Sequence, residues 1–150
     1  MSLLNSPLES SLRLLIALDV DYVALHTLDE WLVFDHIAMH SGDFDGPPSL
    51  HPAFPLRAAD LGARRVQIRL GLEMLLQRDL AILGQKNDAL GIGSADNTRA
   101  VAGALTRRYF HAYRERSEWV KEAGFVENPD SAQTALALVV STWRLTEDQN

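Results

Sequence analysis

Glycine and proline crowd one short stretch of the chain, and neither a helix nor a strand can run through it. Its three prolines fix φ and push the residues before them out of the helical region. Its glycines can take positive φ, and its serines and aspartates can bond neighbouring amides. The stretch therefore predicts an ordered loop that holds one shape. The motif consists of His40, Ser41, Gly42, Asp43, Gly46, Pro47, Pro48, His51 and Pro52.

Capping signals predict two helices before this loop. Asn5 or Ser6 can cap a first helix with Pro7 at its first position, and apolar residues follow at helical spacing. Thr27 and Glu30 have the capping-box spacing, which predicts that a second helix begins there and runs to the loop.

Three further elements are predicted after the loop. Asp60 can cap a third helix from Leu61 to about Arg78. Two short strands, 80–84 and 89–93, then flank a polar turn and predict a hairpin. Ser94, Asp96 or Asn97 can cap a long fourth helix that continues through Trp119 to a glycine stop at Gly124.

The order of elements defines the expected fold class, which is mainly α with a short β-hairpin. With 150 residues and 47% hydrophobic content, the chain fits a single domain over residues 1–150. Helix, helix, helix and hairpin is the order of a winged helix-turn-helix, with a long ordered loop between helices 2 and 3. Residues 126–150 are expected to form a C-terminal extension, as a helix in preference to a strand.

The composition excludes several classes of protein. The chain has no cysteine, so disulfides, thiolate metal sites and a cysteine nucleophile are absent together. The net charge of −6 opposes a protein that coats nucleic acid over its whole surface. No apolar run approaches the roughly 18 to 20 residues of a bilayer span, and the first residues lack the basic start of a secretory signal. We expect a soluble, cytoplasmic protein that does not bind a membrane.

Positive charge is nevertheless concentrated locally. One group lies within a short span around the start of the third predicted helix. Its members inside that helix, Arg64, Arg65 and Arg69, share a face opposite the apolar residues and could bind phosphates or a carboxylate-rich partner. The alternative interpretation is a solvated helix face. This group consists of Arg57, Arg64, Arg65 and Arg69. A second basic group consists of Arg107, Arg108, Arg114, Arg116 and Lys121.

The histidines near the loop raise the question of a metal site. His36 and His40 are four residues apart, so one helix face could offer both imidazoles to a metal, with Asp43 or His51 as further ligands. The ligand set is incomplete, because the first histidine has no glutamate beside it. The interpretation that we favour is that these histidines bond loop carbonyls and hold the loop to the helix end, with no metal and no cofactor.

Catalytic motifs are equally incomplete. Asp43 and Asp45 could do acid–base work, although an aspartate that follows a glycine more commonly accepts backbone amides. No Gly-x-Ser-x-Gly elbow or phosphate-binding loop is found, and Gly91-Ile-Gly93 is too short for a dinucleotide fingerprint. The sequence predicts a protein that is not an enzyme.

Three blocks of sequence together resemble the small middle component of the ABC three-component systems, the bacterial Lamassu-type antiphage and antiplasmid operons. The blocks are Asn5-Ser-Pro-Leu-Glu-Ser-Ser-Leu-Arg13, the loop from His40 to Pro52, and Leu61-Gly-Ala-Arg-Arg65 with the apolar helix and hairpin that follow. The resemblance extends over roughly residues 5 to 123.

The resemblance implies a non-catalytic accessory subunit. Such a subunit would bridge a coiled-coil ATPase resembling the SMC and Rad50 proteins and an effector nuclease, and would help the ATPase engage double-stranded DNA. Two other interpretations stay open. One is a winged-helix transcription regulator, which the long loop and the acidic charge oppose. The other is a metal-dependent hydrolase built on His36, His40 and His51.

Overall fold

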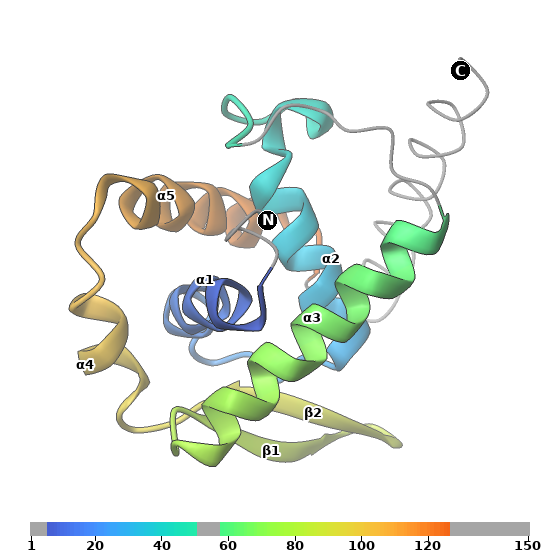
Figure 1. Ribbon diagram of the computed structural model, residues 1–150, viewed down its shortest axis with the longest axis vertical. Coiled ribbons are helices and arrows are strands. Elements are labelled where there is room, and N and C mark those ends of the chain that lie inside the picture. The colour runs from blue at the N-terminus through green and yellow to red at the C-terminus, as the bar shows by residue number, and fades with distance from the viewer. Residues whose placement is uncertain (1–5, 51–57, 127–150) are drawn as a thin grey trace.

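The structure, a computed structural model, describes residues 6–50 and 58–126, and the side chains of the third helix from residue 62 onward. It is mainly helical, with one two-stranded antiparallel hairpin in the described part of the chain (Figure 1). The elements, in chain order, are α1 (Pro7–Val20), α2 (Leu28–Met39), the 3-10 helix η2 (Ser41–Phe44), α3 (Ala58–Gln77), β1 (Ala81–Lys86), β2 (Ala89–Ser94), α4 (Thr98–Gly103) and α5 (Arg108–Ala123).

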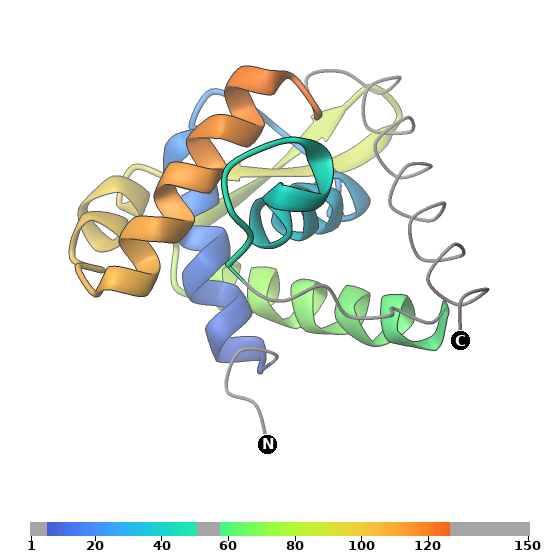
Figure 2. The ribbon, with the colours of Figure 1, turned by 90° about the horizontal axis from the view of Figure 1, so that it is seen from above.

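Helix α1 is the centre of the fold. The helices α2, α3, α4 and α5 all contact it, and Figure 2 shows α3 and α5 on opposite sides of it. Five successive residues, Leu14–Leu18, are buried, so the helix is covered on every side and not along one stripe. The predicted start is confirmed, because the Ser6 hydroxyl accepts a hydrogen bond from the Glu9 amide at 3.1 Å and Pro7 opens the helix.

Helix α2 is also enclosed, and every residue from Glu30 to Ser41 is buried. Its predicted capping box is present. The Thr27 hydroxyl accepts from the Glu30 amide at 3.3 Å, and the Glu30 carboxylate accepts from the Thr27 amide at 2.9 Å.

Helix α3 begins earlier than the sequence suggested. It starts at Ala58, so Asp60 lies inside the helix and the prediction that Asp60 caps it is wrong. The helix packs along α1, and the two backbones approach closely at Gly71, where a Cβ atom would lie 3.0 Å from the Ser11 amide nitrogen. Ile68, Leu72 and Leu75 are buried in the core.

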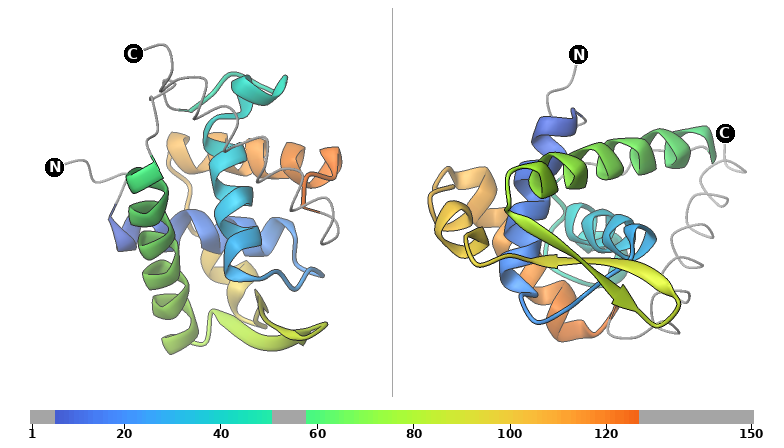
Figure 3. Two further views of the ribbon diagram at one scale, coloured as in Figure 1. Left: turned by 90° about the vertical axis from the view of Figure 1, so that its right-hand side faces the viewer. Right: turned by 90° about the horizontal axis from the view of Figure 1, so that it is seen from below.

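The predicted hairpin is confirmed. Residues 81–86 pair in register with residues 94–89 around a two-residue turn, in which Asn87 has a φ of 54°. The hairpin crosses beneath the helices (Figure 3, right). Its glycines are needed for close approach, because a Cβ on Gly84 or Gly91 would lie 2.9 or 2.6 Å from the Leu25 side chain.

The prediction of a single long fourth helix is wrong. The structure has two helices, α4 and α5, separated by residues 104–107, and Arg107 is extended with φ −64° and ψ 151°. Both helices pack on α1, while α5 also packs on α2, so the chain must change direction between them. Gly103, a poor helix former, falls at the end of α4. The predicted stop at Gly124 is confirmed, with a φ of 73°.

Some predictions fall on other parts of the chain. The C-terminal extension, apart from Val126, and His51, Pro52 and Arg57 of the predicted sites lie outside the described residues. Among the described helices, none is both long and apolar enough to cross a membrane.

Candidate interaction site

The arginines of α3 do not share one exposed face. Arg65 pairs with Asp29 of α2 at 2.8 Å, and Arg69 pairs with Glu73 one turn along its own helix at 2.9 Å. These arginine side chains are 49% and 47% exposed. Arg64 is only 17% exposed, and its guanidinium lies 3.6 Å from the buried carboxylate of Asp35. The expectation that Arg64 lies on the solvated face is therefore wrong.

Asp35 is the hub of a buried ionic cluster that the sequence did not reveal. Arg13 of α1 donates to its two oxygens, from Nε at 2.9 Å and from Nη2 at 3.2 Å, and Tyr113 of α5 donates its hydroxyl at 2.8 Å. Together with Arg64, the cluster joins α1, α2, α3 and α5. No local signal could have found it, because the paired residues are far apart in the sequence.

Electrostatics keep this carboxylate ionised. Burial by itself would raise the pKa of Asp35, but the charge and hydrogen bonds of Arg13, helped by Arg64 and Tyr113, outweigh it and lower the pKa. Burial likewise raises the pKa of the Tyr113 phenol well above its usual value. Two guanidinium groups, those of Arg13 and Arg64, lie around this one carboxylate. The side chains of Arg13 and Asp35 are almost wholly buried.

His36 and His40 lie beside this cluster, at the end of α2. Their rings are 4.7 Å apart and both residues are buried. Burial, followed by the charges of His40 and Arg64, lowers the pKa of His36 well below its ordinary value. In the described part of the chain, no group of three or more His, Cys, Asp or Glu side chains could hold a metal ion. His51, the third proposed ligand, lies outside it.

The predicted loop, which the structure describes as far as Leu50, is held by its own polar groups. The Ser41 hydroxyl donates to the Pro47 carbonyl at 2.8 Å, and the Gly42 amide donates to the Ser49 hydroxyl at 2.9 Å. The Leu50 amide donates to the Met39 carbonyl, at the end of α2, at 3.0 Å. These bonds close residues 41–50 into a compact turn at the end of α2.

Helix α5 holds the other side of this loop. Arg116 donates to the Pro48 carbonyl from Nε at 3.1 Å and from Nη2 at 2.9 Å. Gly46 lies against the indole of Trp119, where a Cβ atom would come within 2.4 Å of a ring carbon. The glycine is needed for this close approach, whereas the positive φ of the loop, 63°, belongs to Asp45. The expectation that Gly42 and Gly46 supply positive φ is wrong.

The second basic group is divided among several partners. Arg114 pairs with Asp19 at 2.9 Å, Lys121 donates to the Val20 carbonyl at 3.1 Å, and Arg116 holds the loop. Arg107 and Arg108, at the start of α5, are exposed. The group therefore serves mainly to attach α5 to its neighbours.

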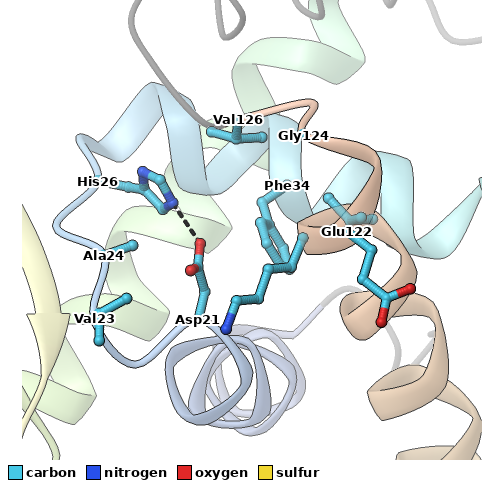
Figure 4. Close-up of a pocket in the computed structure, with 10 residues that line it drawn as sticks. Asp21, Val23, Ala24, His26, Phe34, Glu122, Gly124 and Val126 are labelled. Carbon is cyan, nitrogen blue, oxygen red and sulfur yellow. Dashed lines mark hydrogen bonds and ion pairs between the residues drawn. The ribbon is translucent and has the colours of Figure 1, made fainter.

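A pocket of about 370 Å³ opens between the α1–α2 connection and the end of α5 (Figure 4). Within it, the Asp21 carboxylate points toward the His26 ring, 2.8 Å from Nε2, while the Glu122 carboxylate points away. The other ring nitrogen of His26, Nδ1, lies 3.5 Å from the Lys86 ammonium, and this ammonium pairs with the Glu30 carboxylate at 2.7 Å. The pocket lining contains no hydroxyl or thiol nucleophile. The Asp21–His26 pair thus joins the hairpin to α1 and α2.

These contacts define a small helical domain with a β-hairpin, in which buried ionic groups fix the helices and a compact loop is fastened to α5. A model of the family described as "ABC-three component (ABC-3C) system Middle Component 2" matches residues 3–143. The chain belongs to this family, and the resemblance inferred from the loop and its flanking blocks is confirmed. A component of a three-component system implies protein partners. Comparisons with curated proteins and with solved structures gave no match.

Proposed function

We propose that this chain is a non-catalytic accessory subunit of a Lamassu-type antiphage or antiplasmid defence complex in the cytoplasm. It would bridge an SMC/Rad50-like ATPase and an effector nuclease, and would help the complex detect double-stranded DNA. The observation that carries the proposal is the family match over residues 3–143. On this reading the chain forms one winged-helix-like domain, and its partners perform the chemistry.

The loop is the first surface that we assign to partner binding. Its fastening to Trp119 and Arg116 fixes its shape, while Asp43, Asp45 and Pro48 remain exposed. A preformed loop loses little conformational entropy on binding, so less of its contact energy is offset by ordering. Fixed exposed loops of this kind are typical of binding sites.

The second surface is the exposed part of α3, where Arg65 and Arg69 flank the half-exposed Val66. Their ion pairs are on the surface and contribute little stability, so either arginine can leave its carboxylate for a phosphate or a partner's carboxylate. We retain Arg57 as a candidate because it precedes the same helix. Arg64 belongs to the core.

Co-expression with the ATPase and the effector, followed by affinity purification of the tagged chain, tests the proposal. The wild-type chain should recover both partners and have no ATPase or nuclease activity alone. Gly46→Ala should displace the loop from Trp119 and reduce partner recovery at least fivefold while the far-UV circular dichroism is unchanged. Gly103→Ala is the matched control, because a Cβ there meets nothing within 4 Å. Recovery of the wild-type chain alone, with folded and abundant ATPase present, would refute the accessory role.

A further inference from the structure

Among the residues that the structure describes, the β-hairpin has one edge that no other segment covers. The sheet contains only β1 and β2 among the described residues, and β1 is the outer strand, at the bottom of Figure 1. The opposite edge of β2 is partly covered, because His26 and Ile92 exchange two backbone hydrogen bonds at 3.1 and 2.7 Å.

These two hydrogen bonds show which backbone groups of β1 are not used in the β1–β2 ladder. Ile92 directs its N–H and C=O toward His26, away from β1, so the opposed pair Leu83 and Ile92 is a non-hydrogen-bonded pair of the β1–β2 ladder. Leu83 and, two residues on, Gln85 therefore direct their N–H and C=O groups to the open edge. In the described part of the chain, neither residue makes a backbone bond outside the hairpin.

Nothing in β1 protects this edge in the ways that proteins usually do. The strand has six residues, regular pairing without a bulge, and no proline. Its one lysine, Lys86, is tied to Glu30. Two side chains beside the edge are instead apolar and exposed, with Ile82 at 51% and Leu83 at 53%. An open strand edge with these properties would cause aggregation unless a partner covered it.

An apolar recess adjoins the edge. Leu83 and Leu90 lie diagonally across the two strands on one face, where Leu90 is 63% exposed. With the turn residues they line a shallow recess of about 380 Å³. A strand added beside β1 would place a side chain next to Leu83 on this same face, over the recess.

We propose that β1 receives an extended segment from a partner subunit, which adds to the hairpin as a third strand. The segment would bond the N–H and C=O groups of Leu83 and Gln85 and carry an apolar side chain over the Leu83–Leu90 recess, a known mode of peptide recognition. The inference rests on the proposed function, because the family implies partner subunits and those subunits supply the strand.

Proline substitutions in the full chain, co-expressed with its partner subunits, test this assignment. Leu83→Pro removes an N–H that the β1–β2 ladder does not use, so the hairpin stays intact while the open edge loses a donor. Ser94→Pro is the matched control, since it removes an N–H on the other edge of the same hairpin and lies outside the recess. We expect Leu83→Pro to weaken assembly at least tenfold and Ser94→Pro to change it less than threefold.

Amide hydrogen exchange gives the second readout. In the isolated chain the Leu83 and Gln85 amides should exchange quickly, and assembly should slow them at least tenfold, while the Gly84 amide, bonded within the hairpin, is protected in both states. Assembly without this protection, or with equal effects of the two prolines, overturns the edge assignment and leaves the accessory function standing. Protection that rises with concentration in the isolated chain assigns the edge to a second copy and also overturns it. If the wild-type chain recovers no partner, both proposals fail.

Discussion

Removal of the Asp35 charge tests the buried ionic cluster most directly. Asp35→Asn keeps the shape of the side chain and one oxygen that can accept from Tyr113. It leaves Arg13, whose side chain is 2% exposed, and Arg64 with no opposing carboxylate in the cluster. The new amide nitrogen, itself a donor, must also face guanidinium donors. The variant therefore removes the carboxylate that both guanidinium groups face in the core.

The expected cost is a large fraction of the total stability. Removal of one partner from a buried ion pair destabilises a protein by about 3–5 kcal/mol, whereas domains of this size are stable by about 5–15 kcal/mol. Asp35 accepts from both Arg13 and Tyr113, so we expect the upper half of that range, about 4–5 kcal/mol. Because its pKa is lowered in the folded state, this contribution is complete above about pH 4 and is lost as the pH falls through the folded pKa.

Urea unfolding at pH 7, followed by tryptophan fluorescence and by far-UV circular dichroism, measures the loss. Asp29→Asn is the matched control, because it makes the same chemical change in a surface pair whose carboxylate is 57% exposed. The control should lose less than about 1 kcal/mol. If Asp35→Asn is as stable as the control, with an unchanged urea slope, the cluster does not hold the helices together.

Two further predictions follow from the same region. The pKa of His36 is lowered in the folded chain, so below about pH 6.5 the imidazole takes up a proton in the unfolded chain but not in the folded one. As the pH falls below 6.5, the free energy of unfolding should therefore fall by up to about 1.4 kcal/mol per pH unit. In urea titrations, His36→Gln should flatten this dependence between pH 6.5 and 5. Arg64→Glu should destabilise the protein by about 3 kcal/mol, since it sets a second carboxylate beside Asp35. Arg69→Glu should cost less than about 1 kcal/mol in the same assay, and equal losses would contradict the inward placement of Arg64.

Local chemistry explains which parts of the fold could be predicted from the sequence. The starts of α1 and α2 and the stop at Gly124 each depend on residues within four positions of one another, and the sequence predicts all three. It also predicts the hairpin from two adjacent strands, although the observed turn has only two residues and the first strand continues to Lys86. The division between α4 and α5 depends on how both helices pack on α1, which periodicity does not encode. The sequence places the start of α3 too late, because aspartate is favoured both as a helix N-cap and within the first turn of a helix. Residue type alone cannot tell which of these positions Asp60 occupies, and the structure places it in the first turn.

The candidate site shows the same limit. The loop was located correctly, since its glycines, prolines and serines carry their own signal, but the reason for Gly46 is an indole ring 73 residues further along the chain. The arginines of α3 were grouped by spacing, and spacing alone cannot tell Arg64 from Arg65. A buried carboxylate on another helix, that of Asp35, makes this distinction.

The position of Asp35 connects the core to two of the proposed partner surfaces, the loop and the exposed part of α3. A buried ion pair adds little net stability over apolar residues of the same volume, so what the cluster contributes beyond stability is a fixed geometry. Asp35 lies on α2, which leads directly into the loop, and it holds Arg64 of α3 and Tyr113 of α5. The loop is fastened to α5 by Arg116, three residues beyond Tyr113. The loop and the exposed face of α3 are therefore oriented by one carboxylate, and a partner that contacts both would meet them at a fixed separation. An apolar replacement of the whole cluster could restore stability, but it would remove the hydrogen bonds that set this orientation.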